Sequence, residues 1–330
     1  MIRYILRRFA IAIPLLWIGI TLMFFLIQLA PGDPTTRYVS PRFSPEVREL
    51  MRDRFGLDQP VHVRYWNWLS SFVQGDFGRS FDRGRPVSAV IGDAIGNTLI
   101  LTGLSLFVSL ITGVILGILS AMKRHSVFDR VMSILALFFY SIPGFWLGLM
   151  LILIFALQLG WLPAGGVVSV NHSYLPPGNQ ILDRVVHLIL PVFVLGVTSA
   201  AVTMRYMRGS MLEILQQDFI RTAIAKGLSE RIVYLKHAAR NALGPVISLF
   251  GLSIPFLFSG AVIIEIVFAW PGMGRIMVNA VLARDYPVAI ATTAIAFALV
   301  ILGNLISDIL YAVADPRIRY GNQQSANAVR

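Results

Sequence analysis

Six long apolar stretches recur along the chain of 330 residues, and the segments between them hold nearly all of the charge. They lie at about 9–29, 98–121, 132–157, 186–204, 246–268 and 288–313. A membrane helix needs about 20 mostly apolar residues to cross about 30 Å of hydrocarbon, and these windows meet that requirement. None contains more than one acidic residue, and none has a Lys or Arg except near its ends. The pattern predicts an all-α integral membrane protein with about six transmembrane helices.

The polar segments predict how the chain is organised. Residues 1–29 form an N-terminus and a first span, and residues 30–97 form a loop too long for an ordinary connection, which is expected to hold structure of its own. Residues 98–313 form a five-span core that is interrupted by a polar segment at 205–244, and residues 314–330 form a tail. The first apolar run is too long for the core of a signal peptide, and no small-x-small cleavage site follows it. We therefore interpret it as a retained span.

The net charge of +11 is distributed unevenly among the polar segments between the predicted spans. The segments on one side of the predicted membrane are basic, namely residues 1–8, 122–130, 205–244 and the tail. The segments on the other side carry nearly equal numbers of basic and acidic residues. Lys and Arg accumulate in cytoplasmic loops of membrane proteins. Both termini are therefore predicted to face the cytoplasm. Topology accounts for the basic excess, which in a soluble protein would have indicated nucleic-acid binding.

The loop at 30–97 is then extracytoplasmic. It contains an aromatic-rich run, PVHVRYWNWLSSFVQ, that is closed by the turn-like sequence GDFGRSF. Two interpretations stay open. The loop is either a small cap packed on the outer mouth of the protein or a contact surface for a protein that delivers substrate.

The polar segment contains the stretch DFIRTAIAKGLSERIVYLKHAARN, whose first part alternates with a helical period. The predicted apolar face comprises Phe219, Ile220, Ala223 and Ile224, and the predicted polar face comprises Asp218, Arg221, Thr222 and Lys226. Asp218 suits an N-cap, and Gly227 suits the left-handed position that ends a helix. The pattern predicts a short capped helix followed by a glycine hinge.

A second helix is predicted after this hinge, with Ser229 at its start. Its predicted apolar stripe comprises Ile232, Leu235, Ala239 and Ala242, and its polar side comprises Arg231, Lys236 and Arg240. A basic amphipathic segment of this kind fits anionic lipid headgroups. That interpretation explains neither the hinge nor the small residues Ala223 and Ala225, whereas a short rigid helix offered to a protein partner explains both.

The stretch DFIRTAIAKGLSERIVYLKHAARNALGPVI resembles the cytoplasmic EAA loop of ABC-importer permeases, in the form typical of the first permease subunit of the dipeptide/oligopeptide family. Arg221, Thr222 and Ala223 stand where the general motif has Glu-Ala-Ala, and Gly227 is retained. Further matching pieces follow one another along the chain: LAPGDP, GDFGRSF, SIPGFWLGL, LGWLP, HLILPVFVLG, FAWPGMGR, RDYP and DPRIRY. Their common order over most of the chain carries the resemblance.

The resemblance implies a type I ABC-importer permease fold and a permease subunit in a prokaryotic plasma (inner) membrane, forming half of the path for di- and oligopeptides. It implies a second permease subunit, typically a different chain, two cytoplasmic ABC ATPases, and an extracytoplasmic substrate-binding protein, with no nucleic acid. Relatives that handle nickel complexes, glutathione or oligosaccharides keep those substrates open. The implied ATPase-docking coupling helix comprises Asp218, Phe219, Ile220, Arg221, Thr222, Ala223, Lys226 and Gly227.

The sequence has no GxxxxGK[ST] phosphate-binding loop. We therefore expect a non-catalytic subunit without a cofactor of its own, with ATP and Mg bound by the ATPase subunits. The chain has no cysteine, and its five histidines show no HExxH spacing, so no metal site is expected. Two other classes remain as rivals: a stand-alone secondary transporter or channel, and a membrane anchor for a nucleic-acid or lipid complex.

Five residues inside the spans are candidates for the translocation path or a gate. They are Pro143, Pro191, Glu265, Asn304 and Asp308. Ionisable groups within a span are costly and face protein or a water-filled path, and proline kinks a membrane helix. The alternative is that the acids are satisfied by local backbone or a neighbouring helix and that the prolines have no gating role.

Overall fold

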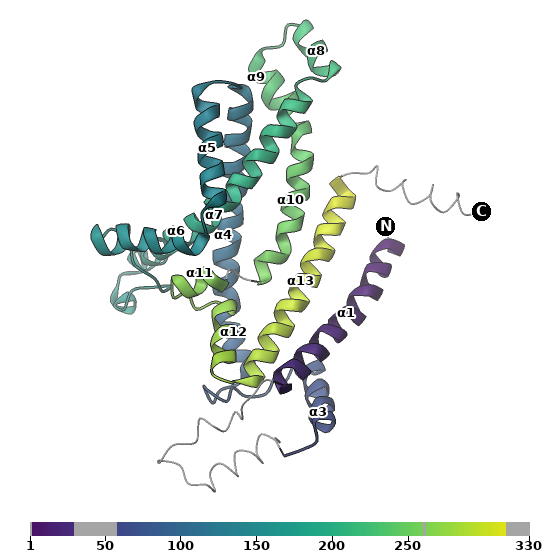
Figure 1. Cartoon of the computed structure of the whole chain (residues 1–330), viewed down its shortest axis with the longest axis vertical. Coiled ribbons are helices and arrows are strands. Elements are labelled where there is room, and N and C mark those ends of the chain that lie inside the picture. Colours follow the sequence, from purple (N-terminus) through teal and green to yellow (C-terminus); the bar gives the residue numbers. More distant parts are fainter. Residues whose placement is uncertain (1, 30–57, 260–261, 315–330) are drawn as a thin grey trace, which may run out of the picture. The chain divides into compact units, whose positions relative to one another are not determined.

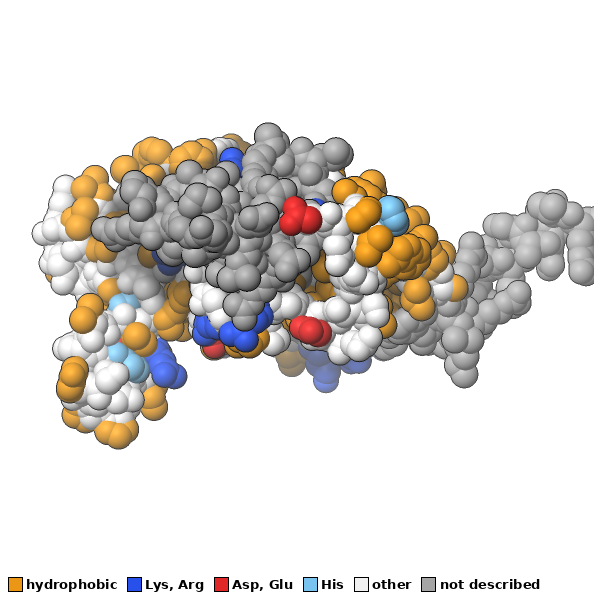
Figure 2. Space-filling model, turned by 90° about the horizontal axis from the view of Figure 1, so that it is seen from below, with side chains coloured by type: hydrophobic (Ala, Val, Ile, Leu, Met, Phe, Trp, Pro, Cys, Tyr) orange, Lys and Arg blue, Asp and Glu red, His pale blue; other side chains and the backbone are white. Residues whose placement is uncertain are grey.

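The computed structural model describes residues 2–29, 58–259 and 262–314 and shows a helical protein (Figure 1). Within these ranges, the β-structure amounts to one bridge between Arg79 and Pro86. The all-α class predicted from the sequence is confirmed. Hydrophobic side chains are spread widely over the face shown in Figure 2, and charged side chains occur there in a few small groups.

The chain divides into two compact units. Unit 1 comprises Met1–Asn97 and Pro271–Leu299, and unit 2 comprises Thr98–Trp270 and Val300–Arg330. The helices of unit 1 are α1 (Ile2–Leu29), α3 (Val61–Val73), the first part of α4 (Val87–Met122), α12 (Met273–Leu282) and the first part of α13 (Tyr286–Ala314). The domain boundaries expected from the sequence stay a prediction.

Unit 2 contains the remainder of α4 and α13 and most of the other helices. These are α5 (Val127–Ser141), α6 (Gly144–Leu151), a π-helix at Ile152–Gln158, a 3-10 turn at His172–Tyr174, α7 (Pro177–Ile214), α8 (Asp218–Ala225), α9 (Glu230–Ile232), a second π-helix at Val233–Ala238, α10 (Ala239–Ser259) and α11 (Val262–Val267).

Three of the six predicted windows lie in helices that are long and apolar enough to cross a membrane within the described residues, namely α4, α7 and α13. The first window lies in α1. The fifth lies in α10 and α11, and residues 260–261 between these helices are outside the described part of the chain.

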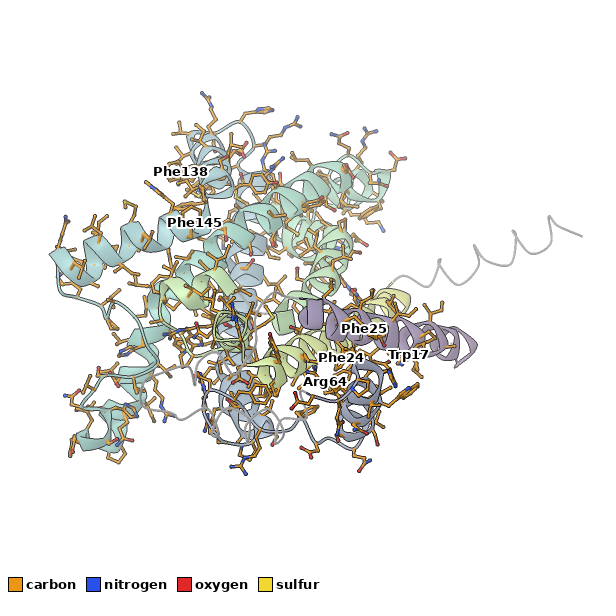
Figure 3. All side chains as sticks on the ribbon, turned by 60° about the horizontal axis from the view of Figure 1, so that its bottom comes forward. Trp17, Phe24, Phe25, Arg64, Phe138 and Phe145 are labelled. Carbon is orange, nitrogen blue, oxygen red and sulfur yellow. The ribbon has the colours of Figure 1, made fainter. Side chains whose placement is uncertain are left out.

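The third window, expected as one span over 132–157, is two helices bent by 101°. Pro143 stands at the break, directly before α6, and Ile142 is extended, with φ −78° and ψ 130°. Proline disfavours the helical conformation in the residue before it, which explains why α5 ends here. Phe138 and Phe145 lie on the two sides of this break (Figure 3). Pro191, in contrast, lies inside α7, which continues through it.

In unit 1, the aromatic-rich run of the outer loop forms α3, and residues 30–57 of that loop lie outside the described residues. Phe24 and Phe25 of α1 lie beside α3, which carries Arg64 (Figure 3). The ring of Phe24 meets that of Tyr65 edge-on at 5.4 Å. The Tyr65 hydroxyl lies 2.7 Å from the Thr21 hydroxyl. These contacts build the aromatic part of the core of unit 1.

The turn before α4 is held by the buried carboxylate of Asp285, which lies directly before α13. This carboxylate accepts hydrogen bonds from the Ser80 hydroxyl and from the backbone N–H groups of Phe81, at 3.0 Å, and Asp82, at 3.3 Å. Because a buried carboxylate is costly without partners, this set of donors makes the burial possible.

In unit 2, α4 and α7 pack at glycine positions. A Cβ atom at Gly113 would lie 2.6 Å from Thr203 Cβ, and one at Gly117 would lie 2.7 Å from Met207 Cβ. Small residues four apart allow the backbones of membrane helices to approach closely. The spacing from Gly113 to Gly117 is the sequence signal for this contact.

Asp129 joins three helices of unit 2. The Arg208 guanidinium of α7 donates to both of its carboxylate oxygens, from Nε at 2.7 Å and from Nη2 at 2.8 Å. The Ser120 hydroxyl of α4 and the backbone N–H of His125 also donate to it. Two parallel bonds from a guanidinium fix geometry as well as charge. The ends of α4, α5 and α7 are therefore held together.

Candidate functional site

The short helix predicted between Asp218 and Gly227 is present as α8, and it begins one residue earlier than expected. Gln217, with φ −76° and ψ 149°, is the N-cap, and Asp218 is the first helical residue. The prediction that Asp218 caps the helix is wrong. A turn follows the end of α7 and reaches Gln217, whose N–H donates to Ile214 O at 3.1 Å, so the chain becomes extended only at that residue. Asp218 instead places a carboxylate in the first turn, where the helix dipole favours it.

The C-terminal end of α8 is confirmed. Gly227 has φ +77°, the left-handed conformation that favours glycine. Its N–H donates to Ile224 O at 2.9 Å, and the N–H of Leu228 reaches back to Ala223 O at 3.4 Å. These bonds close the helix in the manner of a glycine C-cap. The helix therefore has a defined length of eight residues.

The predicted apolar face of α8 is split by the structure. Ile220 is 1% exposed and Ala223 is 7% exposed, whereas Phe219 is 43% and Ile224 is 60% exposed. The buried pair belongs to a core cluster, which we call the base cluster. It comprises Ala121, Met207, Met211, Ile220, Ala223, Val233, Ala238, Ala239, Ala242 and Val246. One side of α8 is thus anchored on α4, α7 and α10, and an apolar pair on its other side has no cover within the described chain.

The polar side chains of α8 lie in solvent. The Arg221 guanidinium is 3.5 Å from the Asp218 carboxylate, and both side chains are largely exposed, so this pair contributes little stability. Thr222 donates its hydroxyl to Asp218 O at 3.0 Å. Lys226 is exposed. Together with the exposed apolar pair, these groups form a mixed surface with little internal pairing.

The second predicted helix begins at the expected residue but follows a different register. Ser229 is the N-cap, without a side-chain hydrogen bond, and a π-helix replaces the α-helix over Val233–Ala238. One extra residue in this turn rotates the faces. Ile232 and Leu235 of the expected stripe are therefore exposed, and Val233 is buried instead. The stripe predicted from a uniform helical period is wrong in its first half.

The second half of that stripe is correct, because Ala239 and Ala242 are buried. Arg231, Lys236 and Arg240 are exposed, as expected for the polar side. The base cluster therefore receives Val233 and Ala238 from the π-helix and Ala239 and Ala242 from α10.

The five path candidates are dispersed in the structure. Pro143 marks the bend between α5 and α6, and Pro191 is buried within α7. Glu265 is fully buried and accepts a hydrogen bond from the Thr98 hydroxyl at 2.7 Å. Asn304 is exposed on α13, and the side chain of Asp308 lies outside the described residues. Their role in the path stays a prediction.

A cavity of about 450 Å³ lies in unit 2 between α4, α7 and α10. Its lining comprises Thr102, Ser105, Leu106, Ser109, Leu110, Leu195, Ser199, Val202, Thr203, Val246, Leu249, Phe250 and Ser253. No charged side chain lines it among the described residues. The sequence predictions did not include these residues, because a window scored for hydrophobicity does not register hydroxyls spaced three and four apart on α4. That spacing was the available signal.

No group of three or more His, Asp or Glu residues is placed to hold a metal ion in the part of the chain that the structure describes.

Comparisons with known proteins identify the family. Residues 113–320 match the family described as the binding-protein-dependent transport system inner membrane component. Residues 1–102 match the family described as the N-terminal part of the membrane component of such systems. This chain belongs to the inner-membrane component family of binding-protein-dependent transport systems.

Individual relatives of this inner-membrane component are similar over nearly their whole length. The oligopeptide transport system permease protein AppB of Bacillus subtilis (strain 168) is 46% identical over 322 residues, 97% of this chain and 100% of the relative. The glutathione transport system permease proteins GsiC of Salmonella typhi and Escherichia coli (strain K12) are 41% and 40% identical over 320 residues, again covering 97% of this chain and 100% of each relative.

The inner-membrane component is therefore a permease subunit of an ABC importer with the type I importer fold. Proteins of this family are multi-pass proteins of the inner membrane that work with another permease, with ATPases and with a binding protein. Permease subunits are in general non-catalytic parts of these transporters.

Proposed function

We propose that this subunit forms half of a translocation path for di- and oligopeptides and that α8 is its ATPase-docking coupling helix. The relatives named for oligopeptide and glutathione transport support peptides as the substrate class, since glutathione is itself a tripeptide. The docking surface comprises Asp218, Phe219, Arg221, Thr222, Lys226 and Gly227, with Ile220 and Ala223 as its anchors.

One observation carries the proposal: α8 is anchored on one side and uncovered on the other. Ile220 and Ala223 are buried in the base cluster, whereas Phe219 and Ile224 are exposed. An exposed aromatic with apolar and charged neighbours is the composition of an interface core and rim. Because the helix is closed by Gly227 and packed on α4, α7 and α10, movement of its outer side is transmitted to the spans instead of being absorbed by a loop.

Membership of the family supports the remaining components of the proposal. The partner in the membrane is a second permease subunit, a different chain, and two cytoplasmic ATPases bind ATP and Mg. The chain itself is non-catalytic and holds no cofactor, consistent with its lack of a phosphate-binding loop. Both termini and α8 face the cytoplasm, and a substrate-binding protein delivers peptide from the opposite side.

The docking role of α8 can be tested with two substitutions that each replace an exposed aliphatic side chain by aspartate, at different places in the chain. Ile224→Asp puts a charge on the uncovered side of α8, and Val73→Asp puts one on the exposed surface of α3. In the reconstituted importer, Ile224→Asp is expected to reduce ATP-driven peptide uptake at least about tenfold and to reduce ATPase co-purification, because a charge left desolvated in an interface costs about 2 kcal/mol or more. Val73→Asp is expected to keep ATPase co-purification, because α3 lies in the loop predicted on the opposite side of the membrane. Equal ATPase co-purification with the two variants contradicts the docking role.

The absence of cysteine allows orientation to be tested directly. Single cysteines replace Phe219 and Val170, which are both exposed. In intact cells, a membrane-impermeant thiol reagent is expected to label the thiol at 170 and not the thiol at 219. Inverted vesicles stripped of the ATPase subunits, which would otherwise cover position 219, are expected to show the opposite. Labelling of position 219 from outside refutes the orientation.

The competing class, a stand-alone secondary transporter, predicts a different result. Purified alone in liposomes, this chain would then move peptide down an ion gradient without nucleotide. We expect no such transport without the ATPase subunits.

A further inference from the structure

The cavity between α4, α7 and α10 combines hydroxyl groups with apolar side chains. Six of its lining residues are Ser or Thr, namely Thr102, Ser105, Ser109, Ser199, Thr203 and Ser253. Its volume of about 450 Å³ lies within the range of about 300–1,000 Å³ that is usual for small-molecule sites. It has polar groups on all three helices and, among its described lining residues, no charge.

Three of the hydroxyls that line this cavity can accept a hydrogen bond from a ligand more readily than they can donate one. A Ser or Thr hydroxyl has one hydrogen to donate and two lone pairs that accept. Ser105 donates to Leu101 O at 2.7 Å, and Ser253 donates to Leu249 O at 2.9 Å. Thr203 donates to the backbone carbonyl of Ser199 at 3.2 Å. Since these hydrogens are committed to the helices' own carbonyls, the lone pairs are what the hydroxyls offer to a ligand.

Ser109 differs from Ser105, Thr203 and Ser253 in its hydrogen bonding. It is only 2% exposed and lines the cavity, and its hydroxyl makes no hydrogen bond within the described chain. Its oxygen is not among the fully enclosed atoms without a partner in the described chain, where His172 Nε2 is the one example, so it is open to the cavity that Ser109 lines. It therefore offers a vacant donor and acceptor in the middle of the α4 wall, one turn beyond Ser105.

We propose that this cavity is a peptide subsite within the path, in which the hydroxyls of Ser105, Ser109, Thr203 and Ser253 accept hydrogen bonds from backbone N–H groups of the peptide. The inference rests on the proposed peptide transport and adds where the substrate is held and by which chemistry. Every peptide carries amide N–H groups whatever its side chains. Recognition through them, without a fixed charge, allows many sequences to pass and keeps each contact weak enough to release.

The test uses the assembled importer, with Ser109→Cys as the sole cysteine of this chain, since the natural chain has none. Serine and cysteine are nearly the same size. Labelling of the new thiol by N-ethylmaleimide is measured with and without triglycine, trialanine or trisarcosine. Triglycine and trialanine keep their amide N–H groups, whereas every amide nitrogen of trisarcosine is methylated. Trialanine also controls for the added methyl volume.

We expect triglycine and trialanine to slow labelling at 109 at least about fivefold and trisarcosine to slow it less than twofold. The matched control is Thr112→Cys. Thr112 lies on the same helix and donates to Val108 O at 2.6 Å, but it does not line the cavity. Labelling there is expected to be the same with all three compounds.

Three outcomes overturn the proposal. If the thiol at 109 is never labelled, a helix of the partner permease fills the cavity. If labelling is unaffected by any of the compounds, lipid or solvent occupies it. If trisarcosine protects as well as trialanine, the hydroxyls do not recognise N–H groups.

A transport measurement separates this inference from the proposed function. Ser109→Ala and Thr112→Val are compared in ATP-driven uptake with saturating, peptide-loaded binding protein. Loss of one hydrogen bond to substrate is expected to change uptake by Ser109→Ala about two- to tenfold, with no change for Thr112→Val. Normal uptake by both variants refutes the subsite and leaves the peptide importer standing. No ATP-driven peptide uptake even by the unsubstituted importer refutes the function itself.

Discussion

The contact between α4 and α7 at Gly117 yields a stability prediction that can be worked from distances. A Cβ atom at this position would lie 2.7 Å from Met207 Cβ and 2.9 Å from the carbonyl oxygen of Met204. Carbon atoms at optimal separation are about 3.5–4.0 Å apart, so Gly117→Ala requires the two helices to separate locally by roughly 1 Å. One obstacle is backbone, and the other is a Cβ atom. Truncating Met207 to Ala therefore cannot relieve the clash.

The controls are glycines in the same helices that face open space. Nothing in the described chain lies within 4 Å of a Cβ placed at Gly103 on α4 or at Gly209 on α7. Replacing glycine by alanine inside a helix gains about 1 kcal/mol from propensity alone, and this gain applies to test and controls alike. The difference between Gly117→Ala and Gly103→Ala therefore isolates the packing cost, which is about 1–3 kcal/mol for an overpacked core.

The assay heats the purified importer in detergent at a fixed rate and follows loss of the monodisperse peak by size-exclusion chromatography. With about 2 °C per kcal/mol for a long chain, Gly117→Ala is expected to lose its peak about 2–6 °C below the Gly103→Ala control. A fixed rate is needed because unfolding of such assemblies is irreversible. Equal apparent midpoints for Gly117→Ala and both controls would refute the close α4–α7 contact.

Three further predictions concern polar links and one close approach. Arg208→Gln leaves the buried Asp129 carboxylate without its guanidinium and is expected to lower the free energy of unfolding by about 3 kcal/mol. Adding Asp129→Asn is expected to recover much of this loss. A double-mutant cycle of apparent unfolding temperatures measures the recovery. Asp285→Ala removes the carboxylate that accepts from a serine hydroxyl and two backbone N–H groups, and it is expected to lower the free energy of unfolding by about 2 kcal/mol or more. The expected result is faster proteolysis in the turn before α4. Asp285→Asn keeps one acceptor oxygen and is expected to be cleaved at an intermediate rate. Gly165→Ala would bring Cβ to 2.3 Å from a backbone oxygen and is expected to lower the apparent unfolding temperature, whereas Gly178→Ala, which meets nothing within 4 Å, is not.

Much of the candidate site could be predicted because it depends on local rules. Gly227 ends α8 because a left-handed residue is needed there, and that need is visible in the sequence as glycine after an amphipathic run. Pro143 breaks the third window for a similarly local reason, since its ring restrains Ile142. The start of α8 was misplaced by one residue, because the end of α7 competes for the same few positions.

Local sequence rules do not predict the π-helix that follows Ser229 and α9. A period of 3.6 assigns Ile232 and Leu235 to the buried side, but the added residue in the turn buries Val233 in their place. The choice depends on which arrangement best fills the base cluster between α7, α8 and α10. Packing against distant residues decided it, and helical periodicity carries no information about that packing.

The sequence by itself determined the helical class, most of the span positions, the polar segment with its glycine-ended helix, and the family, because hydrophobic length, backbone conformation and motif order are properties of neighbouring residues. Only the tertiary structure decided which side of α8 is anchored, that Arg208 reaches Asp129, and that hydroxyls from three helices meet around one cavity. Each of these joins residues that are far apart along the chain, and their meeting is set by how whole helices pack, so no local pattern specifies it.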